Sequence, residues 1–121
     1  MSLLNPFQVE RPWGNFRQFT QNSPCTVKIL TVKPNESLSL QKHQKRAEFW
    51  RVINGSGTVQ IGEMRKETKV NDEHEISIDA EHRLSAGPDG IQVLEISVGD
   101  FTEEDLTRLE DKYGRELGSR F

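Results

Sequence analysis

Turn-forming residues divide this chain into short runs, and their spacing constrains the fold more than any other feature. The turns recur about every eight to twelve residues, a spacing typical of all-β proteins. The runs between them are rich in Val, Ile, Leu and Phe. The expected strands are residues 15–19, 26–32, 37–43, 48–53, 57–61, 67–70, 75–78 and 91–98. Many short strands in this arrangement predict a β-sandwich or a β-barrel.

The last part of the chain has a different period. Residues 102–105 are a threonine followed by three acidic residues, which suits the capped, positive end of a helix. Leu106, Leu109 and Tyr113 then recur at helical spacing, and Gly114 can end the helix. This pattern predicts one short C-terminal helix that packs on the outside of the β structure.

The length and charge of the chain restrict its organisation and partners. A chain of 121 residues can build one core but not two full domains, so we expect a single domain over residues 1–121. Its formal charge is -3, and no block of five like charges occurs. An electrostatic surface for nucleic acid or for a membrane is therefore not expected.

The cysteine content, the N-terminal residues and the lengths of the apolar stretches all indicate the same cellular compartment. The lone cysteine, Cys25, cannot form an internal disulfide, which favours a reducing compartment. Residues 1–6 lack a basic segment followed by a long apolar run. No stretch approaches the roughly 20 apolar residues of a membrane span. We therefore expect a soluble, cytoplasmic protein.

Four residues have the side chains and spacing of a metal site. Gln41 and His43 lie two positions apart on an expected strand, so both point to one face while Lys42 points to the other. Glu48 begins the next strand after a short polar connection, which can bring its carboxylate back beside His43. His82 follows a further strand and two turns, and a closed barrel can return it to the same cavity.

Two imidazoles, a carboxylate and an amide oxygen form a mixed site that suits Zn, Mn, Fe, Co or Ni. The alternative is that His43 and His82 are hydrogen-bonded core histidines and that Glu48 lies on the surface. Spacing alone does not decide between the two interpretations. The third histidine, His74, lies in a charged run and is expected to be solvent-exposed.

A family resemblance adds to this interpretation. Residues 34–43 (PNESLSLQKH), followed by residues 46–50 (RAEFW), resemble the first metal motif of the cupin superfamily. Specifically, they resemble type II mannose-6-phosphate isomerases, including the C-terminal domain of bifunctional isomerase/mannose-1-phosphate guanylyltransferases. Residues 76–84 resemble the second motif, and residues 11–14 (RPWG) and 110–115 (EDKYGR) also match the family. Four matches in the family's order are far more specific than one.

The resemblance implies a fold, a metal and a reaction. The implied fold is a cupin-type double-stranded β-helix, a jelly-roll barrel. The implied ligands of one divalent metal are Gln41, His43, Glu48 and His82, with Zn as the first choice and Co, Mn, Fe or Ni as alternatives. The implied reaction is the reversible conversion of mannose 6-phosphate to fructose 6-phosphate.

This reaction needs residues beyond the metal ligands. A general base must move a proton between two carbons. The sequence does not identify it. Glu48 is a candidate for this catalytic role, although a carboxylate bound to metal is a poorer base. Arginine suits a forked contact with a sugar phosphate. Arg46, which matches an arginine of the motif, is the first choice for substrate contact and catalysis, and Arg115 is the second. Arg11 is a further candidate, with an ion pair that holds the N-terminal segment as its alternative role.

Several positions depart from the family pattern. Gln44 and Lys45 stand where further histidines are usual, and Asn35 replaces a glycine. Asn35 also tolerates a left-handed conformation. Ser77 and Asp79 replace a proline and a glycine of the second motif. The expected metal ligands are all retained, so these departures bear on substrate contacts and proton transfer.

Two other functions remain open at this point. One is a non-catalytic metal-binding cupin that binds a sugar or another small molecule. The other is a different metal-dependent cupin enzyme, such as a dioxygenase or a nucleotide-sugar isomerase. A guanylyltransferase is not expected, because the chain lacks both the length and a Gly-rich strand-to-helix loop. Cupins often dimerise through sheet edges, so a homodimer is expected.

Overall fold

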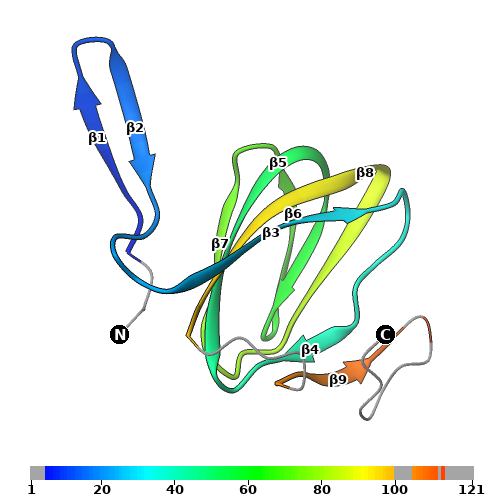
Figure 1. Cartoon of the computed structure of the whole chain (residues 1–121). Helices are drawn as coiled ribbons and strands as arrows, with labels where there is room; N and C mark the ends of the chain where they lie inside the picture. The colour runs from blue at the N-terminus through cyan, green and yellow to red at the C-terminus, as the bar shows by residue number, and fades with distance from the viewer. Residues whose placement is uncertain (1–4, 100–104, 112, 114–121) are drawn as a thin grey trace.

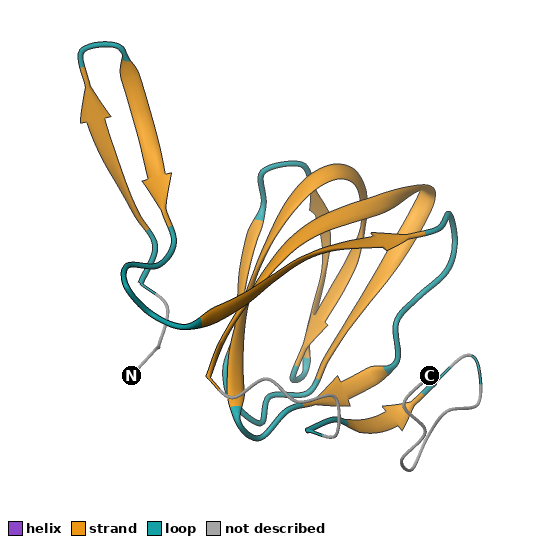
Figure 2. Ribbon diagram, viewed as in Figure 1, coloured by secondary structure: helices purple, strands orange, loops and turns teal. Residues whose placement is uncertain are grey.

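A computed structural model describes residues 5–99, 105–111 and 113 (Figure 1). The regular elements in these ranges are all β-strands (Figure 2), so the expected all-β class is confirmed. The strands are β1 Phe7–Arg11, β2 Gly14–Gln18, β3 Cys25–Val32, β4 Leu40–Lys42, β5 Arg46–Ile61, β6 Met64–Lys69, β7 Glu73–Ile76, β8 His82–Gly99 and β9 Thr107–Glu110. Nothing in the described ranges forms a helix that could span a lipid bilayer.

The long strands β5 and β8 form the frame of the barrel. They pair antiparallel along their whole length, with register shifts between Val52 and Asn54 and between Gly55 and Gly57. At this bend Gly55 has a φ of 75°, and a Cβ there would lie 2.1 Å from the carbonyl oxygen of Gly90. Only glycine fits such a position. The turn expected at residues 54–55 is therefore a bend inside one strand, as bulges often produce.

Because both strands bend, the seven-stranded sheet that they join folds over itself into two facing halves. On one side of the bend, the second half of β8 pairs with β3 and the first half of β5 pairs with β7. On the other side of the bend, the start of β8 pairs with β4 and the second half of β5 pairs with β6. Strand β4 also pairs with β9. The two halves enclose the main apolar cluster, namely Val32, Trp50, Val52, Val59, Ile76, Leu84, Ile91 and Val93. The result is the expected jelly-roll barrel (Figure 2).

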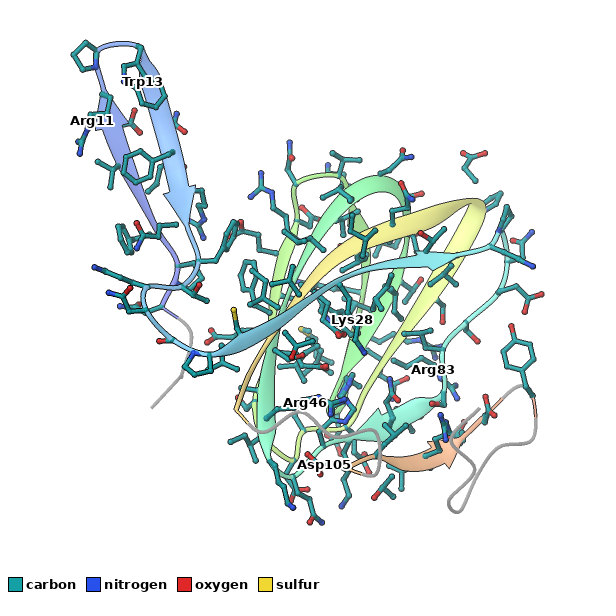
Figure 3. The ribbon with its side chains drawn as sticks, viewed as in Figure 1. Arg11, Trp13, Lys28, Arg46, Arg83 and Asp105 are labelled. Carbon is teal, nitrogen blue, oxygen red and sulfur yellow. The ribbon has the colours of Figure 1, made fainter. Side chains whose placement is uncertain are left out.

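Strands β1 and β2 form a separate hairpin that projects from the barrel (Figure 1). The guanidinium of Arg17 lies 2.6 Å from the carboxylate of Glu73 on β7 and ties the base of the hairpin to the barrel. Arg11 and Trp13 lie at the far end (Figure 3), where Trp13 is 73% exposed. The hairpin therefore adds surface to the molecule but no residue to the main core.

The expected C-terminal helix is wrong for the described residues. Residues 107–110 form strand β9, which pairs with β4 through Gln41 and Arg108 among others. The edge of β4 satisfies the backbone groups of β9, and such non-local pairing overrides a local helical pattern. Residues 102–104, 112 and 114 of the expected helix lie outside the described residues.

Candidate metal centre

The barrel strands direct three of the four expected ligands into one interior position. Glu48 alternates along β5 with Trp50 and Val52, which belong to the core, so its side chain faces inward. His43 follows directly after β4, and His82 is the first residue of β8. The Cα atoms of His82 and Gln41 are register partners, which brings the β4 and β8 ligands together.

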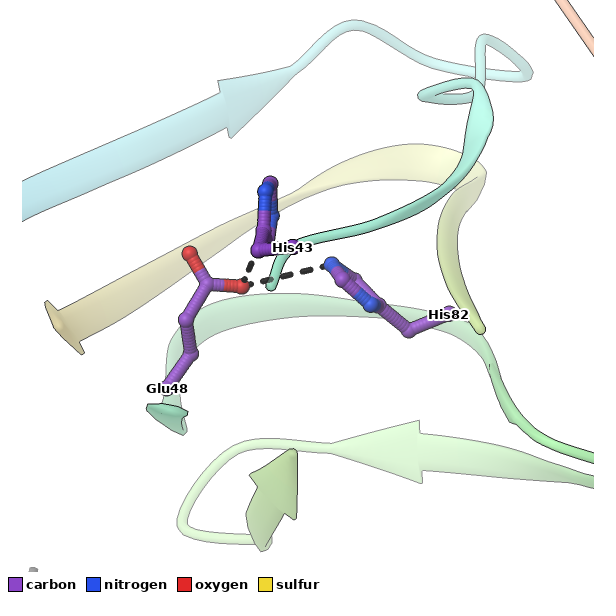
Figure 4. Close-up of side chains that lie close together, drawn as sticks. All are labelled: His43, Glu48 and His82. Carbon is purple, nitrogen blue, oxygen red and sulfur yellow. Dashed lines mark ion pairs between the residues drawn. The ribbon is translucent and has the colours of Figure 1, made fainter. Parts of the chain in front are cut away.

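The geometry of His43, Glu48 and His82 is that of a convergent site (Figure 4). Nε2 of His43 lies 3.4 Å from Oε1 of Glu48, and Nε2 of His82 lies 3.2 Å from the same oxygen. One ligand atom from each residue lies within 4.8 Å of the others. The three side chains are 4%, 2% and 0% exposed, respectively. The alternative in which Glu48 lies on the surface is therefore wrong.

Backbone carbonyls orient both imidazoles. Nδ1 of His43 lies 3.0 Å from the carbonyl oxygen of Asp105, and Nδ1 of His82 lies 2.9 Å from that of Ala80. A carbonyl oxygen only accepts hydrogen bonds, so each Nδ1 carries the hydrogen. Both Nε2 atoms can then present a lone pair to the centre, which is the usual arrangement around metal-bound histidines.

Neighbouring segments hold this arrangement in place. The carboxylate of Asp105 accepts hydrogen bonds of 2.9 Å from the backbone N–H groups of Gln44 and Lys45. Burial raises the pKa of Asp105, but these two bonds and the nearby charges of Arg46 and His43 together outweigh it, so the pKa lies below the ordinary value. Asp79 has a φ of 67° and donates its backbone N–H to the carbonyl of His43 at 2.6 Å. The left-handed conformation explains why a glycine is usual at this position.

The donor set fits a divalent metal. Oε1 of Glu48 and Nε2 of His82 are buried without a hydrogen-bond partner among the described residues, a situation that costs about 1–3 kcal/mol per group. Burial disfavours the charged form of Glu48, but the two neighbouring imidazoles outweigh it, so its pKa lies well below the ordinary value. Arg46 supplies positive charge beside Oε2 of Glu48, which leaves Oε1 and the two Nε2 atoms facing a position that suits a cation.

The fourth expected ligand lies beside this cluster. Gln41 lines the same pocket of about 200 Å³, and its Oε1 lies 3.4 Å from the hydroxyl of Ser39. The pocket is smaller than the roughly 300–1,000 Å³ typical for drug-sized ligands, so it suits a small molecule. Asn35, at the start of the same motif, has the left-handed φ of 62° that its replacement of glycine requires.

The three arginines expected to contact substrate are distributed differently. Arg46 is 6% exposed, and its Nε lies 3.5 Å from Oε2 of Glu48. Arg11 lies on the hairpin, away from Arg46 (Figure 3), with its guanidinium 5.4 Å from the ring centre of Phe16. The expected ion pair that holds the N-terminal segment is made instead by Arg17. Arg115 lies outside the described residues.

Sequence reasoning missed three charged residues of the pocket, namely Lys28, Glu95 and Arg108. Glu95 accepts a 3.0 Å hydrogen bond from the indole N–H of Trp50. Burial and then the charge of Glu48 raise the pKa of Glu95 to about 7. A usable signal existed, because Glu95 shares one face of β8 with the apolar Ile91 and Val93. Arg108 was missed because its segment was expected to form a helix on the outside of the barrel, whereas it forms strand β9.

The expected exposure of His74 is also wrong. This residue is 6% exposed, and its Nε2 lies 2.7 Å from the hydroxyl of Thr68. Pairing of β7 with β5 turns His74 inward together with Ile76, although the neighbouring residues are charged. Burial, followed by the nearby Lys66, lowers the pKa of His74.

Comparison with known proteins agrees with the fold. The family described as mannose-6-phosphate isomerase C-terminal matches residues 4–111. The chain belongs to this family.

The relatives that match this chain are larger proteins. Alginate biosynthesis protein AlgA of Pseudomonas putida is 38% identical over 113 residues, which cover 92% of this chain and 23% of the relative. Mannose-1-phosphate guanylyltransferase ManC of Salmonella typhimurium is 38% identical over 110 residues, which cover 89% of this chain and 23% of the relative. The chain therefore spans about a quarter of the length of these curated relatives.

Solved structures show the cupin fold. Oxalate decarboxylase from Bacillus subtilis matches with a TM-score of 0.66 and 22% identity over 72% of this chain and 24% of that one. A cupin protein from Bacteroides fragilis matches with a TM-score of 0.58 and 21% identity over 84% of this chain and 88% of that one. At such identities the likeness concerns the fold, and it confirms the expected cupin barrel.

Proposed function

We propose that this chain is a metal-dependent aldose-ketose isomerase that interconverts mannose 6-phosphate and fructose 6-phosphate. The observation that carries the proposal is the buried convergence of His43, Glu48 and His82 in a member of the mannose-6-phosphate isomerase C-terminal family. The pocket beside these residues has a size suited to a small molecule and contains both cationic and carboxylate side chains.

In this proposal Gln41, His43, Glu48 and His82 hold one divalent metal, with Zn as the first choice and Co, Mn, Fe or Ni as alternatives. The bound metal would supply Lewis-acid polarisation of a sugar carbonyl. The chain's own contribution is orientation. Hydrogen bonds from Nδ1 to backbone carbonyls hold both imidazoles with Nε2 toward the centre, and the depressed pKa of Glu48 keeps it a carboxylate.

Aldose-ketose interconversion also moves a proton between adjacent carbons, which needs a base within reach of both. Glu95 is the pocket carboxylate that does not belong to the His43–Glu48–His82 cluster. The indole N–H of Trp50 fixes one of its oxygens at 3.0 Å. We assign the proton transfer to Glu95 because of this position. Arg46, which lines the pocket, is assigned to contact the substrate.

A coupled assay tests the proposal. Protein is depleted of metal, reloaded with Zn, Co or Mn, and supplied with mannose 6-phosphate. We expect turnover that depends on metal and is lost in His82→Gln. His74→Gln replaces a buried histidine outside the cluster and serves as the matched control, which should retain turnover. Absence of conversion with every metal, in a folded and metal-loaded sample, contradicts the isomerase while leaving metal binding intact.

A further inference from the structure

The pocket beside the histidines is lined by three basic side chains in addition to the expected metal ligands. Lys28, Arg46 and Arg108 all line it, together with the carboxylates of Glu48 and Glu95. Arg46 and Arg108 are 6% and 7% exposed. Burying a guanidinium is costly unless an anion lies within reach. A divalent metal at Glu48 would raise the positive charge further, so the pocket as a whole favours an anionic ligand.

The three cations are not equivalent. Arg46 lies against the metal cluster, with Nη2 at 3.4 Å from Nε2 of His43 and Nε at 3.5 Å from Oε2 of Glu48. Its guanidinium therefore belongs to the centre of the site. Lys28 and Arg108 line the same pocket from other elements.

Lys28 and Arg108 come from different strands that meet at this pocket. Lys28 lies on β3, where its Cα pairs with that of Glu95 on β8. Arg108 lies on β9, where its Cα pairs with that of Gln41 on β4. One residue thus stands beside the proposed base and the other beside a proposed metal ligand. An anion held by both would leave the rest of its molecule facing the metal cluster.

We propose that Lys28 and Arg108 form an anion subsite that binds the phosphate group of the substrate. An arginine makes forked contacts with phosphate oxygens, and a lysine adds a mobile point charge. The subsite adds Lys28 and Arg108 to the substrate contacts expected from Arg46, Arg115 and Arg11, of which Arg115 lies outside the described residues. The identity of the sugar rests on the proposed isomerase, whereas the recognition of a phosphate monoester rests on these two cations.

Binding to a non-isomerisable probe tests the subsite without requiring turnover. Sorbitol 6-phosphate and sorbitol are titrated into zinc-loaded protein by calorimetry. Wild-type protein should bind the phosphorylated probe much more tightly than sorbitol. Lys28→Met and Arg108→Met should each weaken binding of sorbitol 6-phosphate by about 10- to 100-fold, the loss expected for one charge-assisted contact. Arg108→Lys should lie between Arg108→Met and wild type, and zinc affinity should not change.

Arg83→Met is the matched control. Arg83 lies on β8 outside the pocket, and its guanidinium contacts the carboxylate of Glu110 on β9 at 3.5 Å and its carbonyl at 3.1 Å. The control therefore loses an arginine that supports β9 but does not line the pocket. Its affinity for sorbitol 6-phosphate should stay within about twofold of wild type, well below the effect of one lost hydrogen bond.

The outcomes separate the subsite from the isomerase. Wild-type protein that does not prefer sorbitol 6-phosphate to sorbitol, or variants at Lys28 and Arg108 that bind it as wild type does, would overturn the subsite even if mannose 6-phosphate is converted. Weakened binding in both variants without any conversion would support the subsite and contradict the isomerase. If Arg108→Met fails to fold by circular dichroism, Lys28→Met and Arg108→Lys decide.

Discussion

Two regions inside the barrel each bury histidine, and they differ in what the imidazole meets. Toward the β4 end, the Nε2 atoms of His43 and His82 converge on one oxygen of Glu48 at 3.4 and 3.2 Å. Nearer the bend of β5 and β8, Nε2 of His74 meets the hydroxyl of Thr68 at 2.7 Å. A hydroxyl can donate or accept, so this pair is satisfied without any cation.

The difference shows that burial of a histidine does not by itself make a metal site. A cavity of about 480 Å³, larger than the metal pocket, is lined by Thr68 and Asp72. Size therefore does not locate the chemistry either. The distinguishing feature is a set of electron-pair donors that face one another, with Oε1 of Glu48 and Nε2 of His82 lacking a hydrogen-bond partner among the described residues.

The largest expected effect separates the two histidine environments directly. His82→Gln removes a proposed ligand, so zinc affinity should fall by more than about 100-fold, beyond the loss typical of a residue that only hydrogen-bonds to a ligand. His74→Gln should leave zinc affinity unchanged. Competition with a chromophoric chelator measures both. A comparable loss of zinc affinity in the two variants would show that His82 does not bind the metal in a way that His74 does not.

The next effect distinguishes the residues that bind the metal from the residue proposed to transfer the proton. Glu95→Gln keeps the size of a buried side chain and lies outside the ligand cluster, so zinc affinity should stay near wild type. Turnover of mannose 6-phosphate should fall by about 100- to 10,000-fold, the usual contribution of a general acid-base group. Steady-state kinetics on zinc-loaded protein measures this change. Full turnover in Glu95→Gln would remove this residue from the mechanism.

A smaller effect concerns the satisfied pair. Thr68→Val leaves Nε2 of His74 buried without its partner hydroxyl, which should lower the free energy of unfolding by about 1–3 kcal/mol. Urea denaturation of metal-depleted protein measures the loss, and a double-mutant cycle with His74→Gln isolates the pairwise contribution. Zinc affinity should be unaffected. A coupling energy near zero would show that the hydroxyl does not stabilise the imidazole.

The smallest effect is a pH dependence. The pKa of His74 is lowered by burial, so below about pH 6.5, the ordinary histidine pKa, the unfolded chain binds a proton that the folded chain does not. Stability should therefore fall as pH decreases from 6.5 toward the folded pKa, by at most about 1.4 kcal/mol per pH unit. The difference in free energy of unfolding between wild type and His74→Gln is measured from pH 7.5 to 5.5. It should change below about pH 6.5, the ordinary histidine pKa, and stay constant above it.

Alternating apolar residues predicted much of the barrel. Strand β3 and both halves of β5 follow patterns that are visible locally. The first half of β8 was missed because residues 83–90 contain a Gly-Pro pair and end in glycine, which resembles a turn, yet they pair with β5. Strand β9 was missed because its partner, β4, is distant in the sequence, and local spacing does not report such pairing.

The candidate site was predictable to a similar degree. The order of motifs pointed to His43, Glu48 and His82, which the fold brings together. The sequence misplaced His74, because the charges around it are on the outward face of β7 while the histidine points inward. It missed Arg108 because a residue can be assigned to a pocket only after its strand has been placed.

The last strand separates the part of the chain that folds the barrel from the part that completes its pocket. The main apolar cluster is built from residues between Val32 and Val93, whereas Leu106 and Arg108 line the pocket and Asp105 holds His43. A chain shortened before residue 105 would keep every member of that cluster and lose one wall of the pocket. We therefore expect insertions or fusions near β9 to impair ligand binding before they impair folding.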